Sequence, residues 1–205
     1  IDLYQEVKSL TLEIAFTVFF GDSNEDGKAK MVNHFTNAIR SATTPVRLNL
    51  PLTGYKRGIK SREELMKYFV EQYEAIELGD NRKDLFYELC TAKDENGNQL
   101  SSEDVAQHMI FLLLAAHDTT TSTITNSLWF LAENNGWRNK IIQESIETNL
   151  FDITSLKKAE LMEALFKESI RLYPPVPISP RGIVRDCKIS NYRLEKDSII
   201  AVSPL

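Results

Sequence analysis

From Ser101 to Asn135 the chain contains neither glycine nor proline, so no residue in this stretch interrupts a helix. Ser101 suits an N-cap, and Asp104 three residues later completes a near capping box, with Asp in place of the usual Glu or Gln. A helix of roughly 33 residues would extend about 50 Å, whereas the mean helix has about 11–12 residues. We therefore expect one long helix that crosses the molecule and forms its spine.

Most of the remaining sequence also predicts helices, followed by a short β region. Apolar residues recur at helical spacing in six further segments, namely 2–20, 28–41, 55–78, 81–92, 137–149 and 156–172. After the Pro174-Pro175 break, residues 187–194 alternate as in a hairpin, and residues 198–202 predict another strand. We expect a mainly α fold with a small β-sheet. It would be a single incomplete domain over 1–205, with a helical part in 1–180 and the start of a small β region in 181–205.

The charge and the apolar runs exclude some classes of partner. Against 24 Lys and Arg stand 29 Asp and Glu, a net charge of −5, which argues against nucleic acid as the main partner. The longest apolar run, Met109 to Ala116, is far shorter than the ~20 residues of a membrane span. Ile1 is not a natural start, so we interpret the chain as an excerpt, and an N-terminal anchor would lie outside it.

Cysteine and histidine usage argues against a metal site within the chain. The two cysteines, Cys90 and Cys187, have no neighbour at metal-ligand spacing, and the three histidines are scattered. Thiols without an evident partner favour a reducing compartment, so a cytoplasmic location is expected.

The middle of the expected spine turns polar, with Ala115-Ala116-His117-Asp118-Thr119-Thr120 between apolar runs. Such residues are poor inside helices, and the Thr119 hydroxyl can bond the carbonyl of Ala115 and bend the helix. The small alanines leave room for a groove in which Asp118 and Thr119 order water and pass protons to a reduced oxygen species. The alternative is a solvent-facing polar stripe. His117 is interpreted as a neighbour that points elsewhere rather than as a ligand.

A second unusual segment begins with Glu168 and Arg171, which share a helix face at i, i+3. In isolation this spacing is typical of an exposed pair of little energetic consequence. Because the helix around it is largely apolar, we expect the pair to be partly buried and completed by a third group outside this chain. Arg181 follows the prolines and suits a bidentate grip on a carboxylate, or is a surface Arg at a strand start.

Together the two segments resemble the haem-thiolate monooxygenases, the cytochrome P450 family. Residues 115–120 are similar to its distal helix motif, Ala/Gly-Gly-x-Asp/Glu-Thr-Thr/Ser, with Ala116 in place of the commoner Gly. Glu168-x-x-Arg171 before two prolines is similar to its Glu-x-x-Arg helix. Arg181, with Asp186 after it, matches the arginine that holds a haem propionate. Residues 10–21 resemble the helix before its mobile lid, so the resemblance covers essentially the whole chain.

The resemblance implies a role for each residue. Asp118 and Thr119 would be catalytic, handling protons during O–O cleavage, and Glu168 and Arg171 would form a structural pair. The residues that would contact haem are Ala115, Ala116, Thr119, Phe111, Leu112, Arg181 and Pro177. Those that would line the substrate site are Phe111, Ala115, Val176 and Ile178.

The resemblance also implies a cofactor, partners and a reaction. The cofactor would be haem (iron protoporphyrin IX). The enzyme would hydroxylate a hydrophobic small molecule with O2, and a ferredoxin or flavin reductase would supply the electrons.

The sequence departs from the family at the haem ligand. The family's ligand Cys lies in a Phe-x-x-Gly-x-x-x-Cys-x-Gly loop, which this chain lacks, so neither Cys90 nor Cys187 is assigned as ligand. The ligand would lie outside residues 1–205, which alone would be inactive. Two alternatives stay open: a haem-thiolate peroxygenase, and a cofactor-free helical module that binds a small ligand.

Overall fold

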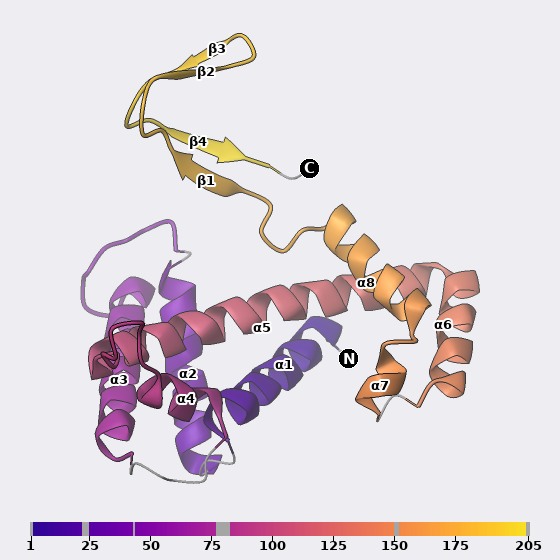
Figure 1. Cartoon of the computed structure of the whole chain (residues 1–205), viewed down its shortest axis with the longest axis horizontal. Coiled ribbons are helices and arrows are strands. Elements are labelled where there is room, and N and C mark those ends of the chain that lie inside the picture. The colour runs from indigo at the N-terminus through magenta and orange to yellow at the C-terminus, as the bar shows by residue number, and fades with distance from the viewer. Residues whose placement is uncertain (1, 22–24, 43, 77–82, 150–151, 204–205) are drawn as a thin grey trace. The chain divides into compact units, whose positions relative to one another are not determined.

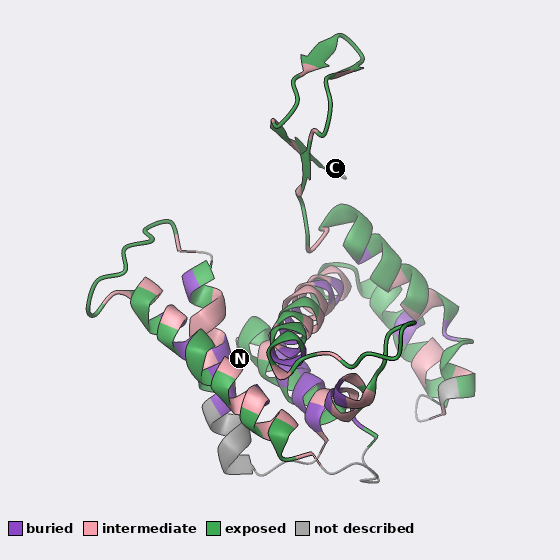
Figure 2. Cartoon of the chain, turned by 60° about the vertical axis from the view of Figure 1, so that its left-hand side comes forward, coloured by how far each residue is buried: buried purple, intermediate pink, exposed green. Residues whose placement is uncertain are grey.

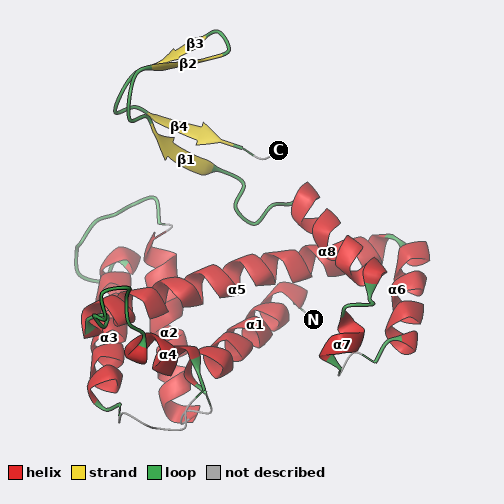
Figure 3. Ribbon diagram, in the orientation of Figure 1, coloured by secondary structure: helices red, strands yellow, loops and turns green. Residues whose placement is uncertain are grey.

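The computed structural model describes residues 2–21, 25–42, 44–76, 83–149 and 152–203, and the described chain is mostly helical (Figure 1). The helices are α1 (Leu3–Phe20), α2 (Glu25–Ala42), α3 (Gly54–Glu74), α4 (Leu85–Thr91), α5 (Ser102–Glu133), α6 (Asn135–Glu147), α7 (Ile153–Leu156) and α8 (Glu160–Leu172). The strands are β1 (Ser179–Gly182), β2 (Cys187–Ile189), β3 (Tyr192–Leu194) and β4 (Ile199–Val202). The mainly α fold with a small β part is confirmed (Figure 3).

The long helix is confirmed as α5, which has 32 residues. The predicted capping box forms in modified form, because the Ser101 hydroxyl accepts from the Asp104 backbone N–H (3.1 Å) and donates to the Asp104 carboxylate (2.8 Å). Side-chain oxygens also cap α3 and α4: Thr53 accepts from the Lys56 amide and Asp84 from the Tyr87 amide. Each cap satisfies a backbone donor that the first turn of a helix leaves unpaired.

The chain divides into two compact units, Ile1–Asp118 and Thr119–Leu205, with the division inside α5. The single incomplete domain over 1–205, with a helical part in 1–180 and the start of a β region in 181–205, stays a prediction. Within each unit, the first half of α5 joins the core of α1 to α4, and Ser127 in its second half bonds Ser169 of α8.

The core of the first unit is built around three phenylalanines from different helices. The Phe20 ring of α1 stacks on Phe69 of α3 with centroids 5.1 Å apart, and Phe86 of α4 lies 5.8 Å from Phe20. The first half of α5 adds fully buried side chains at helical spacing, namely Val105, Ala106, Met109 and Leu113 (Figure 2). This apolar stripe explains why a helix with so many polar residues further on is anchored at its start.

In the second unit, a carboxylate of α6 caps α8. The two oxygens of Glu144 accept hydrogen bonds from the backbone N–H groups of Leu161 (2.8 Å) and Met162 (2.9 Å). Ala159, at the N-cap position of α8, has no side chain that can do this. A negative charge there also complements the positive end of the helix dipole, so Glu144 sets where α8 begins.

The β part consists of two antiparallel pairs, β1 with β4 and β2 with β3. The predicted hairpin over 187–194 is confirmed, with Cys187 opposite Leu194 and a turn at Ser190, whose φ is 53°. Asp186 accepts from the Lys196 amide (2.9 Å) and from Arg193 (3.2 Å), and the first of these bonds contributes most to lowering the pKa of Asp186.

Several predicted element bounds differ from the structure, which also begins α2 at Glu25 rather than at residue 28. The helix expected over 156–172 is divided, because Asp152 caps the short α7, which ends at Leu156, and α8 begins only at Glu160. Helix α6 begins at Asn135, two residues before the expected start, so Gly136 lies inside its first turn. The helix expected over 55–78 ends at Glu74; the one expected over 81–92 is α4, and residues 77–82 between them lie outside the described part of the chain.

Helices α2 and α3 approach closely at Gly58, and this contact leads to a first prediction. A methyl group on Gly58 would overlap the Ser41 side chain and would lie 2.8 Å from the Asn37 carbonyl oxygen. We expect Gly58→Ala to destabilise the protein by about 1–3 kcal/mol, because overpacking outweighs the roughly 1 kcal/mol gain in helix propensity. Urea unfolding measures this. Gly54→Ala, on the same helix with nothing within 4 Å, is the control and should not destabilise.

The cap on α8 leads to a second prediction. Glu144→Ala should lower the free energy of unfolding of this part of the protein by about 1–2 kcal/mol, since two backbone donors lose their acceptor. Glu144→Gln keeps one acceptor oxygen and should lose less. Glu147→Ala is the control, because the Glu147 carboxylate accepts only from Gln143 of its own helix among the contacts described here. Equal unfolding midpoints for Glu144→Ala and Glu147→Ala would contradict the assignment.

Candidate functional site

The polar patch lies in the middle of α5, and the helix continues through it. Three hydroxyls further along donate to carbonyls four residues back: Thr123 to Thr119, Thr125 to Thr121 and Ser127 to Thr123, at 2.8–2.9 Å. This intrahelical bonding is the pattern expected for Thr and Ser inside a helix. The predicted bond from Thr119 to the Ala115 carbonyl stays a prediction.

His117 connects the patch to α1. Its side chain is only 1% exposed, and its Nε2 lies 3.2 Å from the backbone carbonyl oxygen of Lys8. Because a carbonyl only accepts, Nε2 carries the proton in this hydrogen bond. The Phe35 ring of α2 packs against the imidazole edge-on at 6.0 Å. His117 therefore points into the first unit and fixes the polar patch to α1.

The Asp118 carboxylate lies between two nitrogen groups. Its Oδ1 is 3.0 Å from His117 Nδ1 and 4.0 Å from the ammonium nitrogen of Lys8. The side chains of Asp118 and Lys8 are 37% and 26% exposed, so the carboxylate is neither buried nor fully solvated. Burial of the imidazole lowers the pKa of His117, and the nearby Asp118 charge opposes this effect.

An apolar face precedes the carboxylate on the same helix. Phe111 is 63% exposed, and Leu114 and Ala115 are also exposed. These residues and Asp118 stand at positions i, i+3, i+4 and i+7, so they share one face of α5. Leu112 and Ala116, next to this face, are half-buried, as is Thr119. An exposed phenylalanine beside a small alanine offers a surface on which a flat apolar group can lie.

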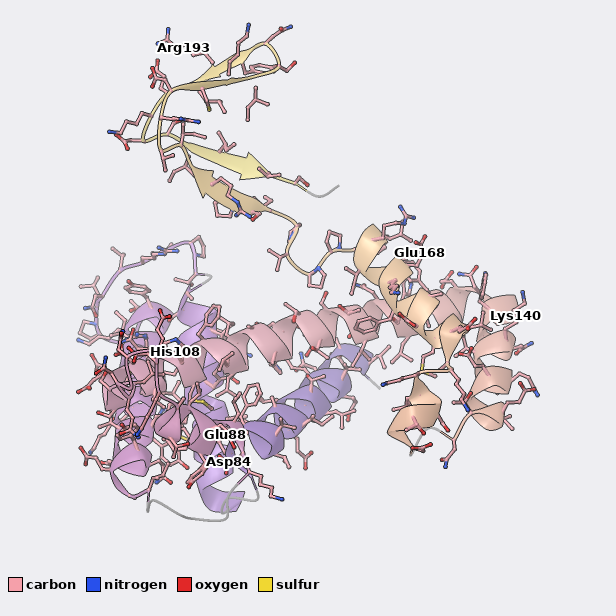
Figure 4. All side chains as sticks on the ribbon, in the orientation of Figure 1. Asp84, Glu88, His108, Lys140, Glu168 and Arg193 are labelled. Atoms are coloured by element: carbon pink, nitrogen blue, oxygen red, sulfur yellow. The ribbon has the colours of Figure 1, made fainter. Side chains whose placement is uncertain are left out.

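Glu168 and Arg171 form a two-point ion pair on α8, the helix on which Figure 4 labels Glu168. Arg171 donates from Nε (2.7 Å) and from Nη2 (2.6 Å) to the two Glu168 oxygens. These bonds lower the pKa of Glu168 and raise that of Arg171. The expected partial burial is wrong, since the side chains are 51% and 65% exposed. The buried side of α8 is centred on Ser169, which bonds Ser127, and the ion pair lies off that side.

The remaining predicted site residues lie in the second unit. Arg181 stands in β1, exposed, and donates to the Ser179 hydroxyl (2.5 Å) and the Pro180 carbonyl (2.9 Å). Val176, Pro177 and Ile178 precede β1 and are exposed. The structure therefore places Phe111 to Asp118 together on one helix face and Val176 to Arg181 together in one segment, and it describes each group within its own unit.

Two pockets of the second unit lie elsewhere. One of about 590 Å³ is lined by residues of α5, α6 and α8 that include Phe130 and Leu165, and one of about 680 Å³ by residues that include Leu128 and Met162. Neither is lined by a residue predicted to contact haem or substrate. Their linings are largely apolar, so they are not candidates for the proton chemistry.

Sequence reasoning missed Lys8 and the inward direction of His117. Lys8 lies 109 residues before His117, and nothing in its local sequence, Glu6-Val7-Lys8-Ser9, distinguishes it from any exposed helix lysine. The one available signal was the pairing of a histidine with an acid inside an apolar helix, because such residues need partners when they are buried.

The described residues contain two free thiols. Cys90, a residue of α4, is buried in the core of the first unit, and Cys187 is half-buried in β2; both are thiols. Within that part of the chain, no group of three or more His, Cys, Asp or Glu side chains is placed to hold a metal ion. Across the same residues, none of the helices combines the length and the apolarity that crossing a membrane requires.

Comparison with known proteins points to one family. The family model described as cytochrome P450 matches residues 1–205. Cytochrome P450 136 of Mycobacterium tuberculosis is 36% identical over 208 residues, covering 98% of this chain and 42% of that protein. Beta-amyrin 6-beta-monooxygenase of Solanum lycopersicum is 28% identical over 207 residues, which cover 96% of this chain and 43% of that protein. The chain thus spans less than half the length of these relatives.

Solved structures show the same fold. Retinoic acid-bound cyanobacterial CYP120A1 superposes with a TM-score of 0.88 at 23% identity, over 100% of this chain and 47% of that one. The crystal structure of a cytochrome P450, CYP102L1, superposes with a TM-score of 0.82 at 18% identity, over 100% of this chain and 50% of that one. At these identities the likeness concerns the fold alone.

The burial of His117 leads to a third prediction, on pH. Because the pKa of His117 is lowered on folding, the unfolded chain binds this proton more readily, so stability should fall as the pH drops below about 6.5. His117→Gln should remove this part of the pH dependence, whereas His108→Gln, an exposed residue on the same helix, should keep it. Urea midpoints between pH 7.5 and 5.5 measure it. An unchanged slope in His117→Gln would refute the proposed cause.

Proposed function

Since this chain belongs to the cytochrome P450 family, we propose that it is part of a haem-dependent monooxygenase that hydroxylates a hydrophobic small molecule. The observation that carries the proposal is the Asp118-Thr119 pair in mid-helix, directly after an exposed apolar face on α5. An acid and an alcohol beside such a face can hold and pass protons where a bound, reduced oxygen species needs them.

The residues present fit haem, the cofactor that the family implies. On α5 the exposed Phe111 and Ala115, with Leu112, Ala116 and Thr119 beside them, offer an apolar face for the flat macrocycle. The exposed Arg181 suits a propionate, because a guanidinium can donate two hydrogen bonds to one carboxylate. Pro177 would border the same group. When bound, haem supplies the activation of O2, and its thiolate ligand favours O–O cleavage.

The thiolate itself is proposed to come from a cysteine outside this chain. Cys90 is enclosed by core residues of the first unit, and Cys187 lies in strand β2 without the glycines that frame the family's ligand loop. Residues 1–205 would therefore supply the distal face and would be inactive alone. Glu168 and Arg171 are proposed to be structural and to be completed by a third group outside this chain.

The chain's own residues would then divide the work. The Asp118 carboxylate would take up protons from solvent, which reaches its partly exposed side chain, and Thr119 would order the water that receives them. Phe111 and Ala115, with Val176 and Ile178, would line an apolar substrate site. O2 is the proposed oxidant, since the acid–alcohol pair favours this over a peroxygenase.

The substrate class is proposed from these side chains and from the relatives. The lining residues are apolar or small, so the ligand would be hydrophobic. Two relatives are named as a beta-amyrin 6-beta-monooxygenase and a taxane 10-beta-hydroxylase, and a solved neighbour holds retinoic acid. We therefore propose a terpenoid, retinoid-like, sterol or fatty-acid substrate. A ferredoxin or a flavin reductase would supply the electrons, and the thiols of Cys90 and Cys187 favour the cytoplasm.

The test is a fourth prediction. The protein expressed from its complete reading frame should give a red-shifted Soret band in the ferrous–CO state. Thr119→Ala should lower the product formed per O2 consumed by about 10-fold or more, because a proton-transfer group is lost. Thr125→Ala is the control: its hydroxyl lies on the same helix and donates to the Thr121 carbonyl. Absence of haem absorbance would favour the cofactor-free module, and unchanged coupling in Thr119→Ala would defeat the assigned roles.

A further inference from the structure

The two ring nitrogens of His117 both face oxygens that accept hydrogen bonds. Nε2 lies 3.2 Å from the Lys8 carbonyl, and Nδ1 lies 3.0 Å from Asp118 Oδ1. A neutral imidazole carries one N–H, so it can satisfy only one of these contacts as a donor. The other contact then sets a nitrogen lone pair against an oxygen lone pair. With one more proton, the imidazolium and the Asp118 carboxylate form an ion pair at 3.0 Å.

We propose that His117 is the positioning residue for the proton-handling acid: the positive charge of a proton on Nδ1 holds the Asp118 carboxylate, whose Oδ1 lies 3.0 Å away. This inference rests on the proposed monooxygenase function, in which Asp118 passes protons onward. When the pair releases the proton, Nδ1 faces the carboxylate as a lone pair and no longer attracts it. Asp118 then takes up the next proton from solvent, so the number of protons on the pair returns to its starting value.

The surroundings of the pair act on the proton of His117 in opposing directions. The charged groups that face it are Lys8 of α1 and Asp118 itself, and α2 contributes the uncharged Phe35 ring. The hydroxyl of Thr11 donates to the same Lys8 carbonyl (3.2 Å), which fixes the acceptor of Nε2. Burial lowers the pKa of His117, which weakens its hold on the proton, while the Asp118 charge strengthens it.

The position of Lys8 gives the cluster a second opposing charge. Its ammonium nitrogen lies 4.0 Å from Oδ1, the same oxygen that faces His117. This charge stabilises the carboxylate and disfavours a proton on the imidazole. Lys8 and Asp118 therefore shift the affinity of His117 for its proton in opposite directions, and each direction can be measured separately.

The first experiment reads the proton without turnover. Histidine labelled with ¹⁵N, in the diamagnetic ferrous–CO state of the complete protein, reports which ring nitrogens are protonated, and His117→Gln assigns the signal. The neutral form should carry its proton on Nε2, and lowering the pH should protonate Nδ1. Asp118→Asn should shift the titration midpoint of His117 to lower pH, and Lys8→Met should shift it to higher pH. His108, exposed on the same helix, is the internal reference, and its ¹⁵N signals should be the same in every variant.

The second experiment measures the consequence for the reaction. His117→Gln keeps a donor for the Lys8 carbonyl but cannot titrate. It should lower product formed per O2 consumed by about 10-fold and remove the pH dependence of that ratio between pH 6 and 8, whereas His108→Gln should change neither. His117→Leu removes both the donor and the titrating group, and thermal unfolding of this variant shows whether the protein still folds.

The outcomes separate this inference from the proposed function. A His117 midpoint that does not move in Asp118→Asn, or a wild-type coupling profile in His117→Gln while Asp118→Asn is impaired, would overturn the inference and leave the monooxygenase function standing. If the complete protein binds no haem, the proposed function fails, and the opposite shifts in Asp118→Asn and Lys8→Met then decide whether the proton on His117 senses these two charges.

Discussion

The structure depends on one unbroken helix, α5, whose first half packs in a core and whose middle carries a polar patch. The first turns of α5 bury Val105, Met109 and Leu113 in an aromatic and aliphatic core, which fixes the rotation of the helix about its axis. Once that rotation is set, the positions of all later side chains follow from the 3.6-residue period. The core at the start of α5 therefore decides that His117 turns inward and that Phe111 and Ala115 face outward.

Polar residues inside a helix have to be satisfied without breaking it. The Thr and Ser residues after the patch achieve this through hydrogen bonds to their own helix, so the segment keeps its geometry despite low helix propensity. The charge of Asp118 cannot be satisfied in this way. Lys8 and His117 supply its partners instead, so the acid is placed by α1 and by its own neighbour on α5.

The sequence predicted what is local and missed what depends on distant partners. The length of α5, its cap at Ser101, the hairpin and the family resemblance all follow from patterns within a few tens of residues. The role of Lys8 could not be predicted, because its contact with Asp118 depends on how α1 packs. The role of Glu144 could not be predicted either, because its bond to the Leu161 amide depends on how α6 packs against α8. The exposure of Glu168 and Arg171 was also misjudged, since apolar neighbours along a helix do not tell which side is covered.

The proposed chemistry follows from the difference between the two acid–base pairs. Glu168 and Arg171 are exposed, oppositely charged and bonded at two points, which lowers the pKa of Glu168, raises that of Arg171 and is consistent with the structural role proposed for the pair. His117 and Asp118 differ because one partner is buried, which opposes charge, while the other carries charge that favours it. A proton balanced between opposing effects moves readily, whereas one stabilised by both partners does not. These opposing effects, rather than the mere presence of an acid, are the reason for proposing mid-α5 as a site of proton transfer.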